Sequence, residues 1–181
     1  MDKKNLLVWI DLEMTGLEPA TNHIIEIASL ITDGELNIIA EGPEIVIHQS
    51  DEILDMMNEW CVTQHGKSGL TDRVRSSKIS LAEAEKQTLD FIHSYTGSEQ
   101  VPLCGNTIGQ DKVFLQKYMP TIVDQLHYRV VDVSTIKELA LRWYPHLEIY
   151  DKKGNHRALD DIRESVAELQ YYRAKIFNPI A

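Results

Sequence analysis

Residues 6–13 read Leu-Leu-Val-Trp-Ile-Asp-Leu-Glu, an apolar run that ends in two carboxylates one residue apart. Such a run is typical of a strand buried in a sheet. Residues i and i+2 of a strand project from the same face, so Asp11 and Glu13 are expected to bring their oxygens close together. Two anions beside a buried strand need a proton or a cation, and carboxylate oxygens favour Mg²⁺ or Mn²⁺. An acidic turn over residues 13–16 is the simpler alternative, and the rest of the chain must decide between the two.

The overall composition predicts one globular domain spanning residues 1–181. Hydrophobic residues make up 43% of the chain and charged residues 25%, which are ordinary values. The apolar stretches are too short to span a membrane, and residues 1–5 are not followed by a signal-peptide core, so we expect a cytoplasmic protein. Cys61 and Cys104 are isolated, which fits a reducing compartment and excludes a thiolate zinc site.

The net charge of −10 argues against broad binding along a nucleic-acid backbone, because that mode relies on Lys and Arg replacing the counterions of phosphates. Any phosphate-bearing substrate is therefore expected to be short. It would be held by bound metal and a few local groups rather than by a basic surface.

The order of apolar and polar segments predicts an α/β fold. Strands are expected at residues 6–13, 24–32, 44–48, 102–105 and 129–133. Helices are expected at residues 80–95, 111–119, 135–143 and 159–175, after a polar and partly helical region at 51–75. Capping boxes at Ser80 with Glu83 and at Thr135 with Glu138 mark two helix starts. Three strands followed by alternating helices and short strands indicate a central mixed sheet of about five strands flanked by helices.

Two later segments carry further acidic residues. Asp111 follows a glycine-containing turn at the start of a predicted helix. His156 precedes another helix, whose first turn contains Asp160 and Asp161. Helix capping is the simpler interpretation of Asp111 and of one of the two later aspartates. It does not explain the second aspartate or the histidine.

The order of these motifs resembles that of the DEDDh exonucleases in the ribonuclease H-like superfamily. The resemblance implies a ribonuclease H-like fold and a site that binds two divalent metal ions, Mg²⁺ or Mn²⁺. It also implies that Asp11, Glu13, Asp111 and Asp161 are the metal ligands and that His156 is the catalytic general base.

The resemblance is closest to the oligoribonuclease branch and covers nearly the whole chain. It is carried by residues 9–17, 104–111, 127–129, 132–135 and 158–165. Many members of the wider family have an aromatic residue before the third acid, where this chain has Gln110, and this difference favours the oligoribonuclease branch over proofreading relatives. The resemblance implies a homodimeric 3′→5′ exoribonuclease that degrades very short RNA, especially dinucleotides.

The chemistry explains why these residue types occur together. Hydrolysis of a phosphodiester needs an in-line water, and two metal ions about 4 Å apart stabilise the attacking and leaving oxygens. Four carboxylates offset the four positive charges of the two ions. His156, with an ordinary pKa of about 6.5, can accept a proton from the attacking water at neutral pH.

The same resemblance implies base-contacting residues. Leu17 corresponds to an apolar wedge between two bases, and Trp60 and His65 are placed to stack on or contact the terminal nucleotide. Stacking of an aromatic side chain on a base is worth roughly 1–3 kcal/mol, which suits a small ligand with few contacts. Core packing is an equally good explanation of Trp60 from the sequence alone.

The phosphate-contacting region of the family matches Thr107, Tyr128, Arg129, Ser134 and Thr135. Tyr128 is expected to reach the active site of the partner protomer. A polar cap on the 5′ phosphate would end the groove and so explain a preference for short chains. Helix capping is a strong alternative for Ser134 and Thr135.

Two other functions compete with this one. The first is a related exonuclease that trims longer RNA or DNA ends; the acidic surface and the presence of Leu17 and Trp60 speak against it. The second is a non-catalytic dimeric binding module in which the acids are only helix caps. The presence of all five motif residues disfavours the binding module.

Overall fold

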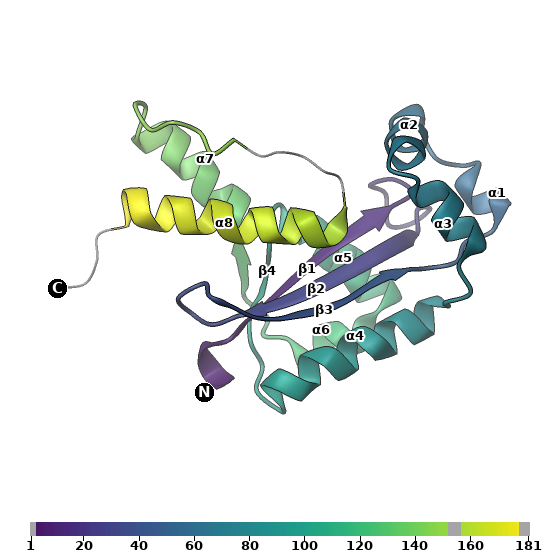
Figure 1. The fold of residues 1–181 in the computed structure, drawn as a ribbon, viewed down its shortest axis with the longest axis horizontal. Coiled ribbons are helices and arrows are strands. Elements are labelled where there is room, and N and C mark those ends of the chain that lie inside the picture. The colour runs from purple at the N-terminus through teal and green to yellow at the C-terminus, as the bar shows by residue number, and fades with distance from the viewer. Residues whose placement is uncertain (1–2, 152–156, 178–181) are drawn as a thin grey trace.

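A five-stranded mixed sheet forms the centre of the computed structural model, which describes residues 3–151 and 157–177 (Figure 1). The strands lie in the order β3-β2-β1-β4-β5. β1 is antiparallel to β2 and parallel to β4, and β4 is parallel to β5. The predicted mixed sheet of about five strands is confirmed. The bounds are β1 (Leu7–Met14), β2 (Ile24–Thr32), β3 (Ile38–Val46), β4 (Leu103–Gly105) and β5 (Val130–Asp132).

Helices cover both faces of the sheet (Figure 1). α7 and α8 lie on one face, α4, α5 and α6 lie on the other, and the short helices α1 to α3 lie beyond the ends of β1 and β2. No helix among the described residues is long and apolar enough to cross a membrane. The bounds are α1 (Asp51–Leu54), α2 (Glu59–Lys67), α3 (Leu70–Ser76), α4 (Leu81–Thr96), α5 (Ile108–Tyr118), α6 (Pro120–Gln125), α7 (Val133–Trp143) and α8 (Ala158–Ile176), after a 3₁₀ turn at Lys3–Asn5.

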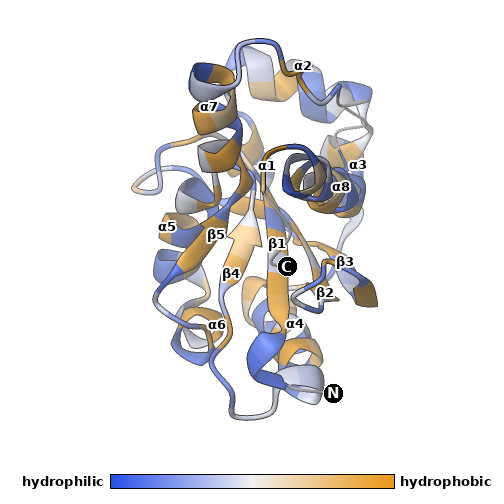
Figure 2. Ribbon diagram, turned by 90° about the vertical axis from the view of Figure 1, so that its left-hand side faces the viewer, coloured by the Kyte–Doolittle hydropathy of each residue, from blue (hydrophilic) through white to orange (hydrophobic). Residues whose placement is uncertain are grey.

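The alternation of side chains along β1 decides where its carboxylates lie. One set of side chains packs into the core under α4, α5 and α6, and it comprises Val8, Ile10 and Leu12. Trp9 points to the opposite face and packs with α8, where its Nε1 donates to Thr32 Oγ1 at 3.0 Å. Asp11 and Glu13 follow Trp9 at intervals of two, so they lie on the α8 face. The hydrophobic strands between the two helical layers are visible in Figure 2.

The third strand is longer than predicted, because β3 spans Ile38–Val46 rather than residues 44–48. β3 is an edge strand, and most of its side chains are exposed or half-buried. It therefore lacks the buried apolar pattern from which a strand is predicted. Pro43 lies within it, and an edge strand tolerates proline because one side of its backbone needs no partner.

The start of α5 and the presence of α6 differ from the prediction. α5 begins at Ile108 rather than at residue 111, directly after Thr107, which has the left-handed φ of 53°. α6 is not among the predicted helices, and it begins at Pro120. Proline suits the first position of a helix, where its missing N–H has no partner to lose.

One predicted helix cap is confirmed and one is wrong. Ser80 Oγ accepts the backbone N–H of Glu83 at 3.2 Å, as its capping box predicts. α7 begins at Val133 and is capped by Asp132, whose Oδ1 accepts the N–H of Ser134 at 3.1 Å, so Thr135 is not the N-cap. Aspartate accepts the backbone N–H groups of a first helical turn as well as threonine does.

Candidate active site

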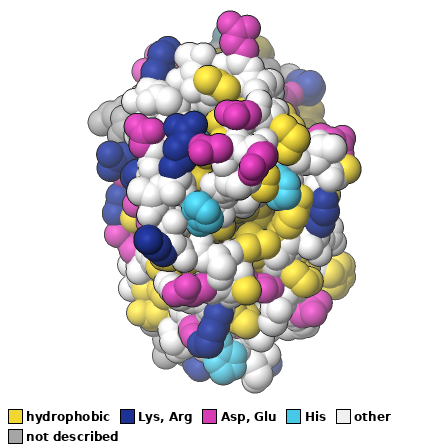
Figure 3. All heavy atoms as spheres, turned by 90° about the vertical axis from the view of Figure 1, so that its right-hand side faces the viewer, with side chains coloured by type: hydrophobic (Ala, Val, Ile, Leu, Met, Phe, Trp, Pro, Cys, Tyr) yellow, Lys and Arg dark blue, Asp and Glu magenta, His cyan; other side chains and the backbone are white. Residues whose placement is uncertain are grey.

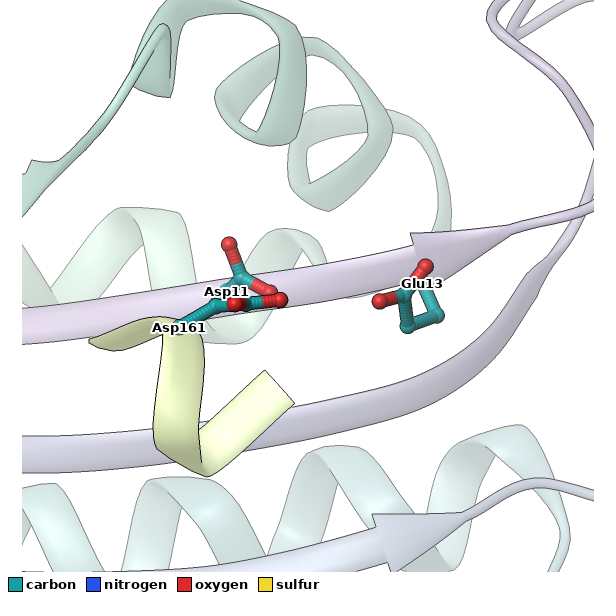
Figure 4. Close-up of side chains that lie close together, drawn as sticks. All are labelled: Asp11, Glu13 and Asp161. Carbon is teal, nitrogen blue, oxygen red and sulfur yellow. The ribbon is translucent and has the colours of Figure 1, made fainter. Parts of the chain in front are cut away.

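Three of the predicted ligands come together between β1 and α8. One carboxylate oxygen from each of Asp11, Glu13 and Asp161 lies within 4.8 Å of the other two. Asp11 and Glu13 share one face of β1, and the first turn of α8 places Asp161 over that face, beside Asp11 (Figure 4). The strand period of two and the packing of α8 on β1 are sufficient to build this group.

Asp111 reaches the same strand from the opposite helical layer. Its Oδ1 accepts the backbone N–H of Leu12, the residue between Asp11 and Glu13, at 3.1 Å. Asp111 is 7% exposed and lies in the first turn of α5. It is not part of the group of three carboxylates, but its charge acts on Glu13. Because its carboxylate binds β1, capping of α5 does not explain it.

Two of these carboxylates, Glu13 and Asp111, have a raised pKa and so hold protons unusually well. Burial raises the pKa of Glu13 to about 8, and the charges of Asp161, Glu26 and Asp111 add to this effect. Burial also raises the pKa of Asp111 to about 7, although the N–H of Leu12 opposes the shift. A divalent cation would replace such protons, and an all-carboxylate donor set fits the hard ions Mg²⁺ and Mn²⁺.

The remaining predicted catalytic residue, His156, lies outside the described residues, so its role stays a prediction. Asp160, the other acid in the first turn of α8, accepts a hydrogen bond from Arg163 Nη1 at 2.8 Å. Asp160 therefore has a structural partner on its own helix, whereas Asp161 is directed toward β1.

A pocket of about 370 Å³ adjoins Glu13. Leu17 is 73% exposed and Trp60 is 63% exposed, and both line this pocket. Core packing, the alternative for Trp60, is thus wrong. Figure 3 shows hydrophobic side chains in the middle of this side of the molecule, with acidic side chains and histidines around them. The full lining is Leu12, Glu13, Met14, Gly16, Leu17, Asn58, Trp60, Cys61 and His65.

His65 is a buried part of the pocket wall. Its Nε2 lies 3.0 Å from the carbonyl oxygen of Met14, and its Nδ1 lies 4.0 Å from Glu13 Oε2. A carbonyl oxygen only accepts, so Nε2 carries a hydrogen. His65 therefore links α2 to the end of β1 and faces the carboxylates.

Three of the five predicted phosphate-contacting residues, Thr107, Ser134 and Thr135, form a second group at the same edge of the sheet. The N–H of Thr107 donates to Ser134 Oγ and to Asp132 Oδ1, both at 2.9 Å. Thr135 Oγ1 donates to Asp132 Oδ2 at 2.7 Å. β4 and β5 run parallel to β1, so the residues that follow them lie at the edge where Asp11 and Glu13 end β1.

Tyr128 and Arg129 lie on the surface just before β5. The Tyr128 side chain is 70% exposed, and the guanidinium carbon of Arg129 lies 5.0 Å from the centre of its ring. Lys112 Nζ donates to the carbonyl oxygen of Tyr128 at 2.8 Å. The cationic side chains of Lys112 and Arg129 thus both contact Tyr128 just before β5, in a protein whose net charge is −10.

Comparisons with known proteins find nucleases that are similar to this chain. The family model described as Exonuclease, RNase T, matches residues 8–169. The oligoribonuclease of Pseudoalteromonas atlantica is 56% identical over 179 residues, which are 98% of this chain and 98% of that protein. The chain belongs to the oligoribonuclease family. A second oligoribonuclease, from Pseudomonas savastanoi, is 58% identical over 99% of this chain and 100% of its own length. A probable oligoribonuclease of Dictyostelium discoideum is 54% identical over 97% and 93%.

Membership of the oligoribonuclease family makes this chain a nuclease, and solved structures confirm its ribonuclease H-like fold. Exonuclease I from Methylocaldum szegediense superposes with a TM-score of 0.75 at 16% identity, covering 94% of this chain and 41% of that one. The zinc-bound complex of E. coli ExoI with ssDNA gives a TM-score of 0.75 at 14% identity, with 96% and 41% covered. The oligoribonuclease-family chain thus spans less than half of either structure.

One site residue was missed by the sequence reasoning. Glu26 of β2 lies directly opposite Glu13 in the antiparallel register and is completely buried. Arg73 Nη2 of α3 lies 3.0 Å from Glu26 Oε1, and the backbone amide of Ala158 at the start of α8 acts to lower the pKa of this carboxyl. Glu26 therefore connects β2 to two helices that border the site. The available signal was a lone charge within the apolar run of residues 24–28.

Replacement of Arg73 is expected to make stability fall with rising pH. Burial raises the pKa of Glu26 and Arg73 opposes that shift, so Arg73→Gln raises the pKa further. Above the raised Glu26 pKa of the parent, the folded variant still holds a proton that both the folded parent and the unfolded chain have lost, so its free energy of unfolding falls relative to the parent as the pH rises through that range. We expect a deficit of about 1–3 kcal/mol at neutral pH, below the ~3–5 of a fully buried pair. The expected loss of stability is smaller than for a fully buried pair because the Arg73 side chain is 40% exposed.

Urea unfolding in EDTA from pH 5 to pH 8 measures this effect. Arg75→Gln is the matched control, because Arg75 lies on the same helix and its partners Asp51 and Asp72 are exposed. The control is expected to lose less than about 1 kcal/mol at every pH. A deficit in Arg73→Gln that does not change with pH would contradict the assignment.

Proposed function

We propose that the chain is a 3′→5′ exoribonuclease that hydrolyses very short RNA, dinucleotides above all, to 5′-mononucleotides. The observation that carries this proposal is the carboxylate group of Asp11, Glu13 and Asp161 beside a pocket with two exposed apolar side chains, Leu17 and Trp60. Relatives that are 54–58% identical over nearly the whole chain are named oligoribonucleases, which supports it.

The proposed cofactors are two divalent ions, Mg²⁺ or Mn²⁺, held by Asp11, Glu13, Asp111 and Asp161. When bound, such ions stabilise the attacking and leaving oxygens of an in-line displacement. The chain itself contributes the geometry: β1 and α8 bring three carboxylates together, and α5 holds the fourth against β1. His156 is proposed to accept the proton of the attacking water, since it precedes the helix that presents Asp161.

The pocket is proposed to take the terminal nucleotide. Its volume of about 370 Å³ falls within the usual range for small ligands, about 300–1,000 Å³. Leu17 lies against the bases, Trp60 stacks on one of them, and His65 contacts the nucleotide from the pocket wall. Exposed apolar side chains next to charged groups are typical of a binding site, because they gain most when a ligand covers them.

The far end of the substrate is proposed to meet Thr107, Arg129, Ser134 and Thr135. Their hydroxyl groups and the Arg129 guanidinium suit a 5′ phosphate, since guanidinium groups bind phosphate oxygens in pairs. A phosphate held at this point ends the groove. Chains with more nucleotides beyond it lose that contact, which favours the shortest substrates.

The proposed active form is a homodimer in which Tyr128 of one protomer reaches the active site of its partner. The exposed Tyr128 ring supports this arrangement. Further support comes from apolar side chains of α7 and its end that are 40–67% exposed, namely Leu141, Tyr144 and Trp143. An apolar helix surface of this kind is typical of contacts between subunits.

Trp60→Ala is expected to weaken dinucleotide binding without unfolding the protein. Loss of one stacking interaction, roughly 1–3 kcal/mol, predicts a KM about 5- to 150-fold higher. The free energy of unfolding should change by less than about 1 kcal/mol, because Trp60 is 63% exposed. Steady-state kinetics and urea unfolding measure both values. Val62→Ala, at a 51% exposed position of the same helix outside the pocket, is the control and should leave KM unchanged.

The proposed function is tested by timing mononucleotide release from a 5′-labelled dinucleotide and from a longer RNA, each with and without EDTA. We expect faster release from the dinucleotide and none from either substrate in EDTA. Faster release from the long strand would favour an enzyme that trims longer ends. Absence of any metal-dependent release would favour a non-catalytic binding module.

A further inference from the structure

The loop that carries Leu17 is the feature from which a further role can be inferred. This loop, residues 15–23, connects β1 to β2 and closes on itself through its own hydrogen bonds. The N–H of Thr15 donates to the carbonyl of His23 at 3.0 Å, and the N–H of Glu18 donates to Asn22 Oδ1 at 2.9 Å. Gly16 permits this closure, because a Cβ there would lie 2.5 Å from Asn22 Oδ1.

One face of α5 holds the outer side of this loop. Gln110 Nε2 donates to the carbonyl oxygen of Leu17 at 2.7 Å. Two turns further along, Lys117 Nζ donates to the carbonyl of Ala20 at 3.1 Å, and Tyr118 Oη donates to the carbonyl of Asn22 at 2.6 Å. Residues 110, 117 and 118 of a helix share a face, so α5 contacts the loop at both of its ends.

The hydrogen bond from Gln110 to the Leu17 carbonyl lies next to the pocket. The backbone carbonyl of Leu17 is bound to α5 while its side chain is 73% exposed and lines the pocket, so the bond determines where that side chain projects. Gln110 also directly precedes Asp111, whose carboxylate holds the N–H of Leu12. Two consecutive residues of α5 thus make separate contacts. Asp111 binds β1 next to the carboxylates, and Gln110 binds the loop at Leu17.

We infer that Gln110 is a positioning residue that sets where Leu17 stands relative to the carboxylates, and thereby the fit of a dinucleotide. This inference rests on the proposed function, because it requires Leu17 to contact the bases. The Gln110 amide does not touch the reacting atoms. Its effect is transmitted through the Leu17 backbone, and the loop keeps its second attachment at Lys117 and Tyr118 when the amide is removed.

Gln110→Met removes the donor but keeps the length of the side chain and its suitability for a helix. Loss of one hydrogen bond predicts a dinucleotide KM about three- to ten-fold higher, with kcat unchanged. Calorimetric binding of the dinucleotide in EDTA should weaken by the same factor. Gln116→Met is the matched control, because Gln116 is an exposed residue of the same helix outside the pocket lining, and it should leave KM unchanged.

A double-mutant cycle with Leu17→Ala separates positioning from a general structural effect. Leu17→Ala alone should raise the dinucleotide KM about 10-fold or more by removing the apolar contact. In that background Gln110→Met should change KM by less than about two-fold, because Gln110 then has no wedge to position.

The outcomes distinguish the two proposals. An unchanged KM in Leu17→Ala would overturn the role proposed for Leu17 and this inference with it. A raised KM in Leu17→Ala with an unchanged KM in Gln110→Met would overturn this inference alone. Equal effects of Gln110→Met in both backgrounds, or a higher Mn²⁺ requirement of Gln110→Met, would also overturn it, because Gln110 would then act independently of Leu17 or through Asp111.

Discussion

Asp11→Asn is expected to lower dinucleotide turnover by about 10³-fold or more, the largest effect of any single substitution considered. Asp11 has an oxygen within 4.8 Å of both Glu13 and Asp161, so it is central to the proposed metal site. Asparagine keeps the shape and one oxygen but removes the negative charge. We therefore expect Mn²⁺ affinity to fall together with kcat.

Isothermal titration with Mn²⁺ and single-turnover kinetics at saturating Mn²⁺ measure these two quantities. Asp124→Asn is the control, because this exposed aspartate lies on α6, outside the carboxylate group. It should bind Mn²⁺ and hydrolyse the dinucleotide as the parent does. Parental metal affinity in Asp11→Asn would contradict its assignment as a ligand.

His156→Ala is expected to have the second largest effect, and of a different kind. Loss of a general base lowers turnover by about 10²–10⁴-fold. Mn²⁺ affinity should stay within about two-fold of the parent, because the proposed ligand set is intact. The pH profile of kcat should also lose the limb that rises near the histidine pKa of about 6.5.

The comparison of the two variants is the sharper test. Equal losses of metal affinity in Asp11→Asn and His156→Ala would show that both residues are ligands, and the separate roles proposed for them would be wrong. A pH profile that is unchanged in His156→Ala would place the general base elsewhere; His65, buried 4.0 Å from Glu13, would be the next residue to replace.

The parts of the fold that follow local periodicity could be predicted from the sequence. The apolar run before Asp11 gave β1, and the strand period placed Asp11 and Glu13 on one face. The edge strand β3 could not be predicted in full, since its exposed side chains carry no burial pattern. The cap of α7 was missed because Asp132 and Thr135 are both good caps and only the backbone decides between them.

The sequence predicted that Asp11, Glu13 and Asp161 come together, but it did not predict the contacts that support them. The bond from Leu12 N–H to Asp111 joins two layers of the fold that no local pattern connects. The ion pair of Glu26 with Arg73 and the bond from Gln110 to Leu17 are likewise long-range contacts, which depend on how helices pack at the end of the sheet. Short motifs indicate which atoms do the chemistry, whereas packing determines what holds them in place.

Carboxylates from β1, α5 and α8 are proposed to share divalent ions. Diffraction from Mn²⁺-soaked crystals at the manganese absorption edge tests this proposal most directly. We predict two anomalous peaks among Asp11, Glu13, Asp111 and Asp161, and we expect both peaks to be weaker or absent in crystals of Asp11→Asn. Peaks located only elsewhere on the molecule, or no peak beside Asp11 at saturating Mn²⁺, would contradict it.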